Sequence, residues 1–365
     1  MDEIEAQRAA ALLHHRRVGP GEGLAPPIHP AVTFHLPQVE GAAHVYGRNG
    51  MPGWDAVEGQ LALLEDAPCV AFPSGMAAIT AALMATLKAG DRVILPADGY
   101  YVTRVLARDF LAGFGVEAVE LPTRAYPQSD FAGAAVVWAE SPSNPGLEVI
   151  DLAAVGARAH AAGARLVVDN TTMTPLLQRP LDLGADLVVA ADTKAPAGHA
   201  DVLFGHVAGR DAALMARVRD WRRLSGAVPG PFEAWLVARG LETLEVRLTR
   251  MCGTAQTVAE RLATHPRVRG LRYPGLSSDP AHAVARAQMK DFGFLIGFEL
   301  EDAARAEAFL AACPCLAQTT SFGGTHSSAE RRARWGDPVA PGYIRLSVGL
   351  EPAEVLWGAI AEALG

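Results

Sequence analysis

The hydrophobic positions in the middle of the chain form short runs that alternate with helical patterns. The apolar runs fall at residues 92–95, 116–121, 134–139, 165–168, 186–191 and 202–207. Between them, hydrophobic residues are spaced as in helices over 76–89, 101–113 and 152–162, and Asp151 is placed to cap the last of these. This alternation predicts an α/β fold, with a mainly parallel sheet that has helices on both faces.

The two ends of the chain follow other patterns. Residues 1–45 contain five prolines, which predict an extended arm with one short helix rather than a continuous helix. We expect this arm to contact a neighbouring subunit. Residues 46–240 hold the α/β pattern. A long helix after this part is expected to lead into a smaller α+β domain over 241–365, with strands at 292–300 and 343–348.

Charge and composition argue against several classes of function. The net charge is -8, the pI is about 5.8 and no basic stripe is present, so a nucleic acid is not expected as a partner. The N-terminus lacks the basic start and apolar run of an export signal. The longest apolar stretch, residues 131–139, is too short to cross a bilayer. We therefore expect a cytoplasmic protein that does not enter a membrane.

The residues that commonly bind metals do not form a recognisable set. The cysteines fit neither a zinc site nor a dense disulfide framework, so we expect them to be buried as small hydrophobic residues: Cys69, Cys252, Cys313 and Cys315. The histidines include no H-E-x-x-H motif. The sequence therefore predicts no metal site.

Polar residues directly follow three of the predicted strands. The runs that end at positions 139, 168 and 191 lead into the polar segments 140–144, 169–171 and 192–194. Because ligands bind beyond the carboxyl ends of strands in open α/β sheets, we expect Asn144, Asp169 and Lys194 to converge on one crevice. Each also has an ordinary structural explanation: Asn144 in a turn, Asp169 as a helix cap and Lys194 as a surface charge.

The rarity of lysine favours a chemical role for Lys194. The chain contains only Lys88, Lys194 and Lys290, while arginine is heavily used, so a lysine at the end of a buried strand is hard to explain as a surface charge. Lysine forms Schiff bases, which arginine does not. A carboxylate such as Asp169 suits a pyridinium cofactor, because holding the ring nitrogen protonated makes the ring an electron sink.

A turn of small residues at 73–77 opens into a predicted helix and offers backbone N–H groups to an anion. The competing interpretation is the G-x-S-x-G turn of a hydrolase, but Phe72 stands where its first glycine is required. The chain also lacks the G-x-G-x-x-G and G-x-x-x-x-G-K-[ST] motifs of dinucleotide and nucleoside-triphosphate sites. We therefore expect the turn to bind the phosphate of a different cofactor.

Short motifs lie along nearly the whole chain, at residues 46–48, 74–78, 98–103, 140–145, 168–171, 184–188, 193–194, 198–201, 239–243, 321–324 and 345–351. Together they resemble the motifs of the Cys/Met-metabolism family of pyridoxal-phosphate enzymes. The family includes cystathionine γ-synthase, cystathionine γ- and β-lyases, methionine γ-lyase and O-acetylhomoserine sulfhydrylase. The resemblance implies an aspartate-aminotransferase-type structure (fold type I), pyridoxal 5′-phosphate as cofactor and residues 46–240 as the domain that binds it.

The resemblance also implies roles for individual residues. Lys194 would bond the cofactor and move protons, Asp169 would pair with its pyridine nitrogen and Tyr100 would stack on its ring. The other implied cofactor-binding positions are Tyr46, Arg48, Ser74, Gly75, Met76, Asn144, Thr171 and Thr193, and the implied substrate-binding positions are Asn144, Ser321 and Arg345. Tyr46 and Arg48 would serve the phosphate of a neighbouring subunit, so the resemblance implies a homodimer at least, and we expect a homotetramer.

Three positions depart from the family pattern and bear on the reaction. Ala191 stands in place of a second phosphate-binding serine, Ala195 in place of an aromatic residue, and His326 in place of a glutamate near the distal end of the substrate. Residues 325–335 resemble those of bacterial members described as cystathionine γ-lyases or γ-synthases. We therefore expect an amino-acid substrate and rank cystathionine γ-lyase first, then γ-synthase, then β-lyase or methionine γ-lyase. An aminotransferase and a non-catalytic homologue are the alternatives from other classes.

Overall fold

The computed structural model describes residues 3–365, whose strands form two sheets. The larger sheet contains β1 (Cys69–Phe72), β2 (Arg92–Pro96), β3 (Glu117–Leu121), β4 (Val136–Glu140), β5 (Arg165–Asp169), β6 (Leu187–Ala190) and β7 (Gly205–Ala208). Its order is β1-β7-β6-β5-β4-β2-β3, and all neighbours are parallel except those that β7 forms with β1 and β6. The predicted mainly parallel sheet is confirmed.

Helices cover both faces of this sheet. They include α2 (Pro52–Glu65), α3 (Gly75–Thr86), α5 (Leu152–Ala161), α6 (Thr174–Leu177), α7 (Ala212–Ser225) and α8 (Pro231–Leu241). Along β2, Val93 and Leu95 join the core under α3 and α7, whereas Ile94 joins the core under α5. Strands buried on both faces are apolar throughout, which explains the short runs in the sequence. Asp151 caps α5 as predicted, accepting a hydrogen bond from the N–H of Ala154.

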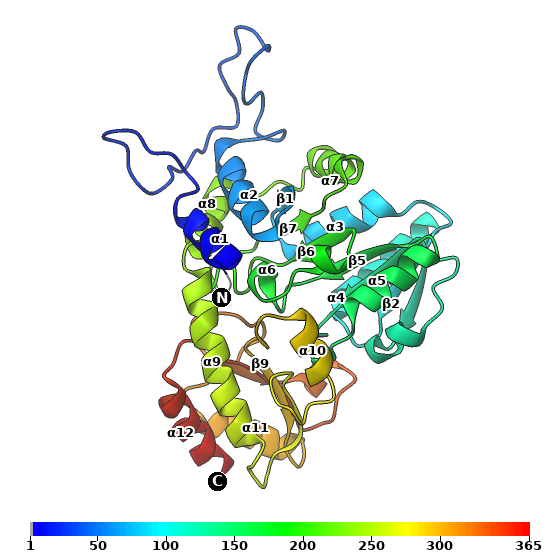
Figure 1. The fold of residues 1–365 in the computed structure, drawn as a ribbon, viewed down its shortest axis with the longest axis vertical. Helices are drawn as coiled ribbons and strands as arrows, with labels where there is room; N and C mark the ends of the chain where they lie inside the picture. The colour runs from blue at the N-terminus through cyan, green and yellow to red at the C-terminus, as the bar shows by residue number, and fades with distance from the viewer. Residues whose placement is uncertain (1–2) are drawn as a thin grey trace.

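The smaller sheet lies in the C-terminal part of the chain. Its order is β10-β11-β9-β8, and its antiparallel strands are β8 (Arg269–Arg272), β9 (Leu295–Glu299), β10 (Ser328–Arg331) and β11 (Tyr343–Ser347). It is accompanied by α10 (His282–Gln288), α11 (Ala303–Ala312) and α12 (Ala353–Leu364), and the long α9 (Leu244–Leu262) runs down beside it from the larger domain (Figure 1). The strands expected at 292–300 and 343–348 are β9 and β11. The division after residue 240 falls at the last residue of α8, three residues before α9 begins, and stays a prediction.

The N-terminal arm contains α1 (Glu3–Leu13), the short helix expected there, followed by extended chain up to α2. Figure 1 shows this segment looping away from the body beyond α2. Part of the arm is attached to its own chain, because the indole of Trp235 donates to the carbonyl of Pro26 at 2.9 Å and Arg8 pairs with Asp66 at 3.3 Å. Its contact with a neighbouring subunit stays a prediction.

The helix expected over residues 101–113 is not regular. α4 (Tyr101–Val105) continues as a π-helical turn, Leu106–Phe110, and a 3₁₀ turn, Leu111–Phe114, before Gly115 ends the segment with φ of 80°. Gly113 and Gly115 weaken the last turn, and glycine readily adopts the left-handed conformation that ends it. The pattern also missed β1.

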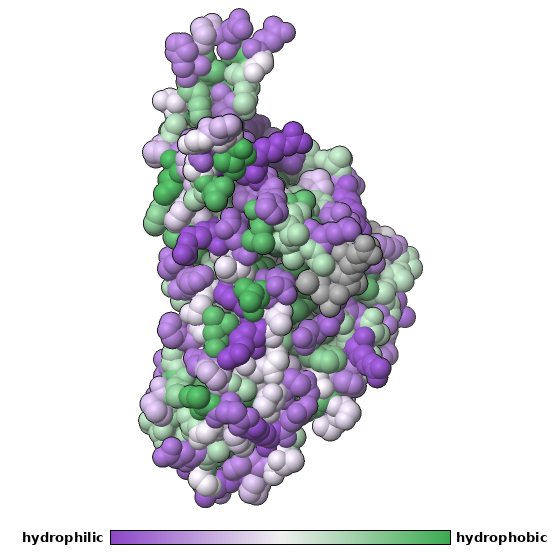
Figure 2. Space-filling model, turned by 60° about the vertical axis from the view of Figure 1, so that its left-hand side comes forward, coloured by the Kyte–Doolittle hydropathy of each residue, from purple (hydrophilic) through white to green (hydrophobic). Residues whose placement is uncertain are grey.

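The described hydrophobic residues gather mainly in buried clusters. No helix within residues 3–365 is long and apolar enough to cross a membrane. On the face shown in Figure 2, hydrophobic residues form scattered patches among polar ones rather than a continuous band. The cysteines are free, and they are buried as predicted except for the half-buried last one: Cys69, Cys252, Cys313 and Cys315.

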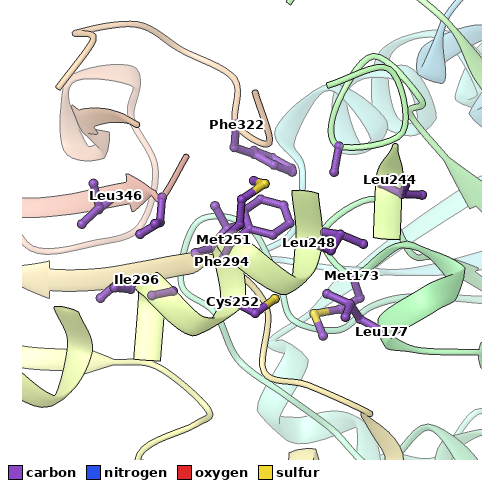
Figure 3. Packing of buried hydrophobic residues seen from close by; sticks show 14 of the residues in the cluster. Met173, Leu177, Leu244, Leu248, Met251, Cys252, Phe294, Ile296, Phe322 and Leu346 are labelled. Carbon is purple, nitrogen blue, oxygen red and sulfur yellow. The ribbon is translucent and has the colours of Figure 1, made fainter. Parts of the chain in front are cut away.

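Helix α9 lies in one hydrophobic core that includes residues from around both sheets. Leu248 and Met251 on α9 lie near Met173 on one side and Phe294 on the other (Figure 3). Phe322 packs at the edge of this core, with its ring centre 6.5 Å from that of Phe294. The core therefore supports the segment around Phe322, which lines the cavity described below.

Replacing Leu248 tests the packing of α9. Leu248→Ala should lower the free energy of unfolding by about 2–5 kcal/mol, because the side chain is 2% exposed and its removal leaves a cavity. Val246→Ala on the same helix is the matched control. Its side chain is 60% exposed, so its substitution should change the free energy by less than about 0.5 kcal/mol. Denaturant unfolding followed by circular dichroism measures both, and equal losses would contradict this packing.

Candidate active site

A cavity of about 380 Å³ opens beyond the carboxyl ends of β4, β5 and β6. The predicted site residues that line it are Ser74, Gly75, Met76, Tyr100, Asn144, Asp169, Thr171, Thr193, Lys194, Ser321 and Arg345. They come from strand ends and turns of the larger domain and from the segment around β11 in the smaller one. The expected convergence of Asn144, Asp169 and Lys194 at one edge of the sheet is confirmed.

The N-terminus of α3 forms one wall of the cavity. The Ser74 hydroxyl caps this helix by accepting a hydrogen bond from Ala77 at 3.1 Å, and Gly75 and Met76 occupy positions whose N–H groups have no partner within a helix. A Cβ at residue 75 would lie 2.5 Å from the Cβ of Ala191, so only glycine fits there. This exposed helix start is suited to a phosphate group.

Two threonines beside this wall are bonded to the backbone. The Thr193 hydroxyl donates to the carbonyl of Phe204 at 3.1 Å and accepts from its N–H at 2.9 Å. The Thr171 hydroxyl accepts from the N–H of Ala191 at 2.9 Å. Thr193 would have to release the Phe204 carbonyl in order to donate to a phosphate. Its role as a phosphate ligand therefore stays a prediction.

Two carboxyl groups lie at the ends of neighbouring strands. Glu140 accepts backbone hydrogen bonds from Tyr100 and Asn144, both at 2.7 Å, and Asp169 accepts one from Thr171 at 3.0 Å. Burial raises the pKa of Asp169, although the Thr171 hydrogen bonds and the charge of Lys194 oppose that rise. Burial and the charge of Asp169 raise the pKa of Glu140 well above its usual value. A cationic ring nitrogen beside Asp169 would favour its ionised form.

Lys194 reaches the cavity from the turn that follows β6. Its Nζ donates to the hydroxyl of Ser321 at 2.8 Å and lies 5.1 Å from the ring centre of Phe322. Burial, assisted by the charge of Arg345, lowers the pKa of Lys194 to about 8. Much of the amine is then neutral near pH 8, and the neutral amine is the form that attacks a carbonyl carbon. Ser321 has φ of 79°, which is strained for any residue with a side chain.

Arg345 enters the cavity from β11. It donates to the side-chain oxygen of Asn144, to the carbonyl of Ser321 at 2.8 Å and to Glu330 at 2.9 Å. Its buried Nε has no partner among residues 3–365. A substrate carboxylate would supply that partner, and the planar guanidinium suits this anion.

Sequence reasoning missed the charged residues behind Arg345. Glu330, 1% exposed, also accepts from Arg332 at 2.5 Å, and Arg332 pairs with Asp337 at 2.6 Å. Glu330 and Arg345 are direct partners across β10 and β11. Their fifteen-residue separation gave no local signal, because only strand pairing brings the two charges together. Arg332 lines the cavity as well.

Tyr46 and Arg48 lie elsewhere in the described part of this chain. Arg48 donates to the carbonyl of Arg223 at 3.0 Å, and its guanidinium lies 5.7 Å from the ring centre of Tyr46. Tyr46 is 40% exposed, and neither residue lines the cavity of its own chain. Their contact with the cofactor phosphate of a neighbouring subunit stays a prediction.

Comparison with known proteins identifies the class of site. The sequence pattern of the family described as Cys/Met metabolism PLP-dependent enzyme matches residues 14–365. The chain belongs to this family. It is an enzyme of cysteine and methionine metabolism that uses pyridoxal phosphate, and its fold is the type I fold of such enzymes.

Individual relatives narrow the chemistry to transsulfuration. A Streptomyces coelicolor protein named "Putative cystathionine gamma-lyase" is 48% identical over 92% of this chain and 87% of its own. L-methionine gamma-lyase from Pseudomonas putida is 38% identical over 94% and 93%. The structure of cystathionine gamma synthase from Xanthomonas oryzae in complex with cystathionine has a TM-score of 0.92 at 32% identity, covering 100% of this chain and 98% of that one. These three names denote different reactions of one class.

The cavity fits pyridoxal phosphate on its own geometry. The crowded start of α3 at Gly75 offers backbone donors to the phosphate, and Asp169 is a buried carboxyl group suited to a ring nitrogen. Lys194 supplies an amine whose lowered pKa favours reaction with an aldehyde. The cavity therefore has a suitable group for the phosphate, the ring nitrogen and the aldehyde of this cofactor.

The reactivity of Lys194 tests its environment. In full-length protein freed of cofactor, acylation of Lys194 should reach half its maximal rate near pH 8, because only the neutral amine reacts. A lysine in a short peptide should do so near pH 10.4. Peptide mass spectrometry after brief labelling at a series of pH values measures both. A midpoint for Lys194 equal to that of the peptide would contradict the burial described above.

Proposed function

We propose that this enzyme is a cystathionine γ-lyase, which converts cystathionine to cysteine, 2-oxobutanoate and ammonia. The observation that carries the proposal is a second cavity of about 530 Å³ beside the first. The two cavities share Thr193, Leu203, Thr320, Ser321 and Phe322. A substrate held between Lys194 and Arg345 would therefore have adjoining space for the group beyond its sulfur atom.

The lining of the second cavity includes the polar residues Asp201, Thr319, His326 and Ser328, beside apolar ones such as Val202, Leu203 and Phe322. Cystathionine carries an ammonium and a carboxylate at its distal end, and both need polar partners. Methionine ends in a methyl group, which would leave those polar residues without a ligand. The lining therefore favours cystathionine, and the "Putative cystathionine gamma-lyase" relative supports the same choice.

Residues of this chain have distinct parts in the proposed reaction. Bound pyridoxal phosphate supplies an electron sink for negative charge at the substrate Cα. Lys194 takes the Cα proton on its neutral Nζ, which the Ser321 hydroxyl orients. Arg345 binds the α-carboxylate and so directs the Cα–H bond toward Lys194. Asp169 keeps the ring nitrogen protonated.

Cystathionine γ-synthase is the second candidate. The similar Xanthomonas oryzae structure named for that activity holds cystathionine. Cystathionine is the product of the synthase and the substrate of the lyase, so both reactions require the distal space. They differ in what completes the reaction after the γ-substituent leaves: cysteine in the synthase and water in the lyase.

Substrate comparison tests the proposal. The holoenzyme should form keto acid and thiol from cystathionine with a kcat/KM at least about tenfold above that for methionine. Homocysteine, cysteine, and O-acyl-homoserine with cysteine complete the panel, followed for keto acid, thiol and cystathionine. Faster synthesis of cystathionine from O-acyl-homoserine would replace the lyase by the synthase. Accumulation of a stable pyridoxamine form with substrate alone would indicate an aminotransferase.

Asp169→Asn tests the pairing with the ring nitrogen. The variant should retain cofactor but lose rate on the order of 100-fold, because a neutral amide does not hold the pyridinium proton. Cofactor absorbance and kcat measure the two effects. Asp109→Asn makes the same change at an exposed carboxylate and should keep wild-type kcat. An unchanged kcat in Asp169→Asn would refute the assignment.

We further propose a homodimer, within a homotetramer, as the functional unit, with Tyr46 and Arg48 serving the phosphate in the neighbouring chain. Mixing Arg48→Ala and Lys194→Ala chains should then restore activity after subunit exchange, because each hybrid dimer holds one site without either change. Random pairing makes about half of the dimers hybrid, so roughly a quarter of sites should be native. No recovery, with exchange confirmed by mass, would place both residues in their own chain's site.

A further inference from the structure

A buried histidine lies between two buried carboxyl groups behind the cavity. Nδ1 of His206 is 2.9 and 3.0 Å from the two oxygens of Asp192, and its Nε2 is 3.3 Å from Oε1 of Glu65. His206 and Asp192 are fully buried, and Glu65 is 1% exposed. The three residues come from β7, from the turn after β6 and from the end of α2. The histidine thus joins three elements that are distant in sequence.

The charge of His206 is set by these two neighbours. Burial alone would lower its pKa, but the charges and hydrogen bonds of Asp192 and Glu65 outweigh burial and raise the pKa to about 10. Its partners in strand pairing, Ala71 on β1 and Ala190 on β6, carry no charge. At neutral pH the ring is therefore an imidazolium that donates from both nitrogens.

Cys69 on β1 is a further titratable residue close to this group, and Glu58 and Arg222 form hydrogen bonds with the backbone of Ala71, the β1 partner of His206. Burial raises the pKa of Cys69 well above the usual value, and Glu65, Glu58 and Asp192 add to that rise. The thiol is therefore neutral and contributes no charge. Within residues 3–365 no group of three His, Cys, Asp or Glu side chains is arranged to hold a metal ion. The His206 group is thus an ion-paired cluster of the protein itself.

The cluster is attached to the turn that carries Lys194. Asp192 begins this turn, and its carbonyl accepts from the N–H of Ala197 at 2.9 Å. The next residue, Thr193, is bonded to the backbone of Phe204 in both directions. Two consecutive residues before Lys194 are therefore fixed to the start of β7, one by charge and one by hydrogen bonds.

The same end of β7 touches the start of α3. A Cβ at Gly205 would lie 2.7 Å from the Cα of Gly75 and 2.8 Å from the carbonyl of Ser74. Gly205 lies between the two residues that hold the turn, Phe204 and His206. The start of β7 therefore contacts both the Lys194 turn and the N-terminus of α3, where we expect the phosphate to bind. A shift of His206 would change the distance between these two parts of the site.

We propose that His206, held between Asp192 and Glu65, is a positioning residue that fixes Lys194 relative to the phosphate-binding start of α3. This inference rests on the proposed function in one respect, namely that Lys194 is the lysine that bonds the cofactor. It extends that function to three residues that do not touch the cavity. The competing explanation is a purely structural ion pair, since removal of one partner from a buried pair destabilises a fold in any case.

Asp192→Asn separates the two explanations, because it keeps the shape of the side chain and removes its charge. In full-length protein freed of cofactor, the variant should bind pyridoxal phosphate at least about tenfold more weakly, a size common for residues that orient a ligand. The pH midpoint of Lys194 acylation should also move. Asp192→Glu, which keeps the charge, should recover part of both losses.

Asp279→Asn is the matched control. Asp279 is a buried carboxylate beside the smaller sheet, and the hydrogen-bond partners of its side chain, Arg272, Tyr273 and Ala281, all lie outside the Lys194 turn. It should lower stability toward denaturant but leave cofactor affinity and the Lys194 midpoint unchanged. Equal loss of stability in both variants, with affinity and midpoint unchanged in Asp192→Asn as well, would overturn the proposal.

A second variant covers the case in which Asp192→Asn does not fold. Glu65→Gln leaves the pair of His206 and Asp192 in place and should weaken cofactor binding about threefold, a smaller effect than Asp192→Asn because only the longer contact is altered. Unchanged affinity in folded Glu65→Gln would also overturn the proposal. Borohydride reduction and peptide mapping of the wild-type holoenzyme test the underlying assignment separately. A label on Lys88 or Lys290 would refute the role of Lys194, whereas a label on Lys194 with unaffected variants would refute only the role of His206.

Discussion

Titratable groups buried around and behind the cavity need partners, and the surrounding structure is arranged to supply them. An unpaired buried charge costs far more than a buried apolar group, so each one constrains the elements around it. Glu140 accepts hydrogen bonds from two backbone N–H groups, and Glu330 accepts hydrogen bonds from Arg332 and Arg345. The His206 ring lies between the carboxyl groups of Asp192 and Glu65. Each of these arrangements joins segments far apart in sequence. The position of the site thus follows from electrostatic pairing as much as from hydrophobic packing.

Two groups in the cavity are less completely paired, and both are residues for which we propose a chemical role. Arg345 has a buried Nε without a partner in the described part of the chain, and Lys194 contacts a neutral hydroxyl instead of a carboxylate. Both side chains have lowered pKa values, because burial destabilises their charged forms. Ser321 adds backbone strain at the point where these two side chains meet. Such local costs are expected where a ligand completes the structure.

What the sequence could and could not predict follows from the range of the interactions. Asn144, Asp169 and Lys194 were predictable because each lies at the end of a strand or a few residues beyond it. The parallel order of the sheet then brings the strand ends together. Two charge pairs were not predictable. Glu330 and Arg345 come together only through the pairing of β10 with β11. Asp192 meets His206 only because the turn after β6 passes β7. The 101–113 segment also differed from its pattern, since helical spacing does not distinguish α, π and 3₁₀ turns.

Ala191, which stands where the family pattern has a phosphate-binding serine, affects how the phosphate can be bound. A serine hydroxyl expected from the family resemblance is absent there, and the Thr193 hydroxyl is bonded to Phe204, so side chains offer few donors to the phosphate. The backbone N–H groups at the start of α3 must then contribute more of the binding. Backbone donors are fixed in direction, so their effect depends on where α3 lies relative to Lys194. Gly205 and Gly75 set that separation by direct contact, and the neighbouring His206 anchors the turn on the other side. With few side-chain donors that can adjust to the phosphate, the positions of α3 and the Lys194 turn must be held more rigidly. The buried His206, Asp192 and Glu65 behind the cavity hold the Lys194 turn in this way.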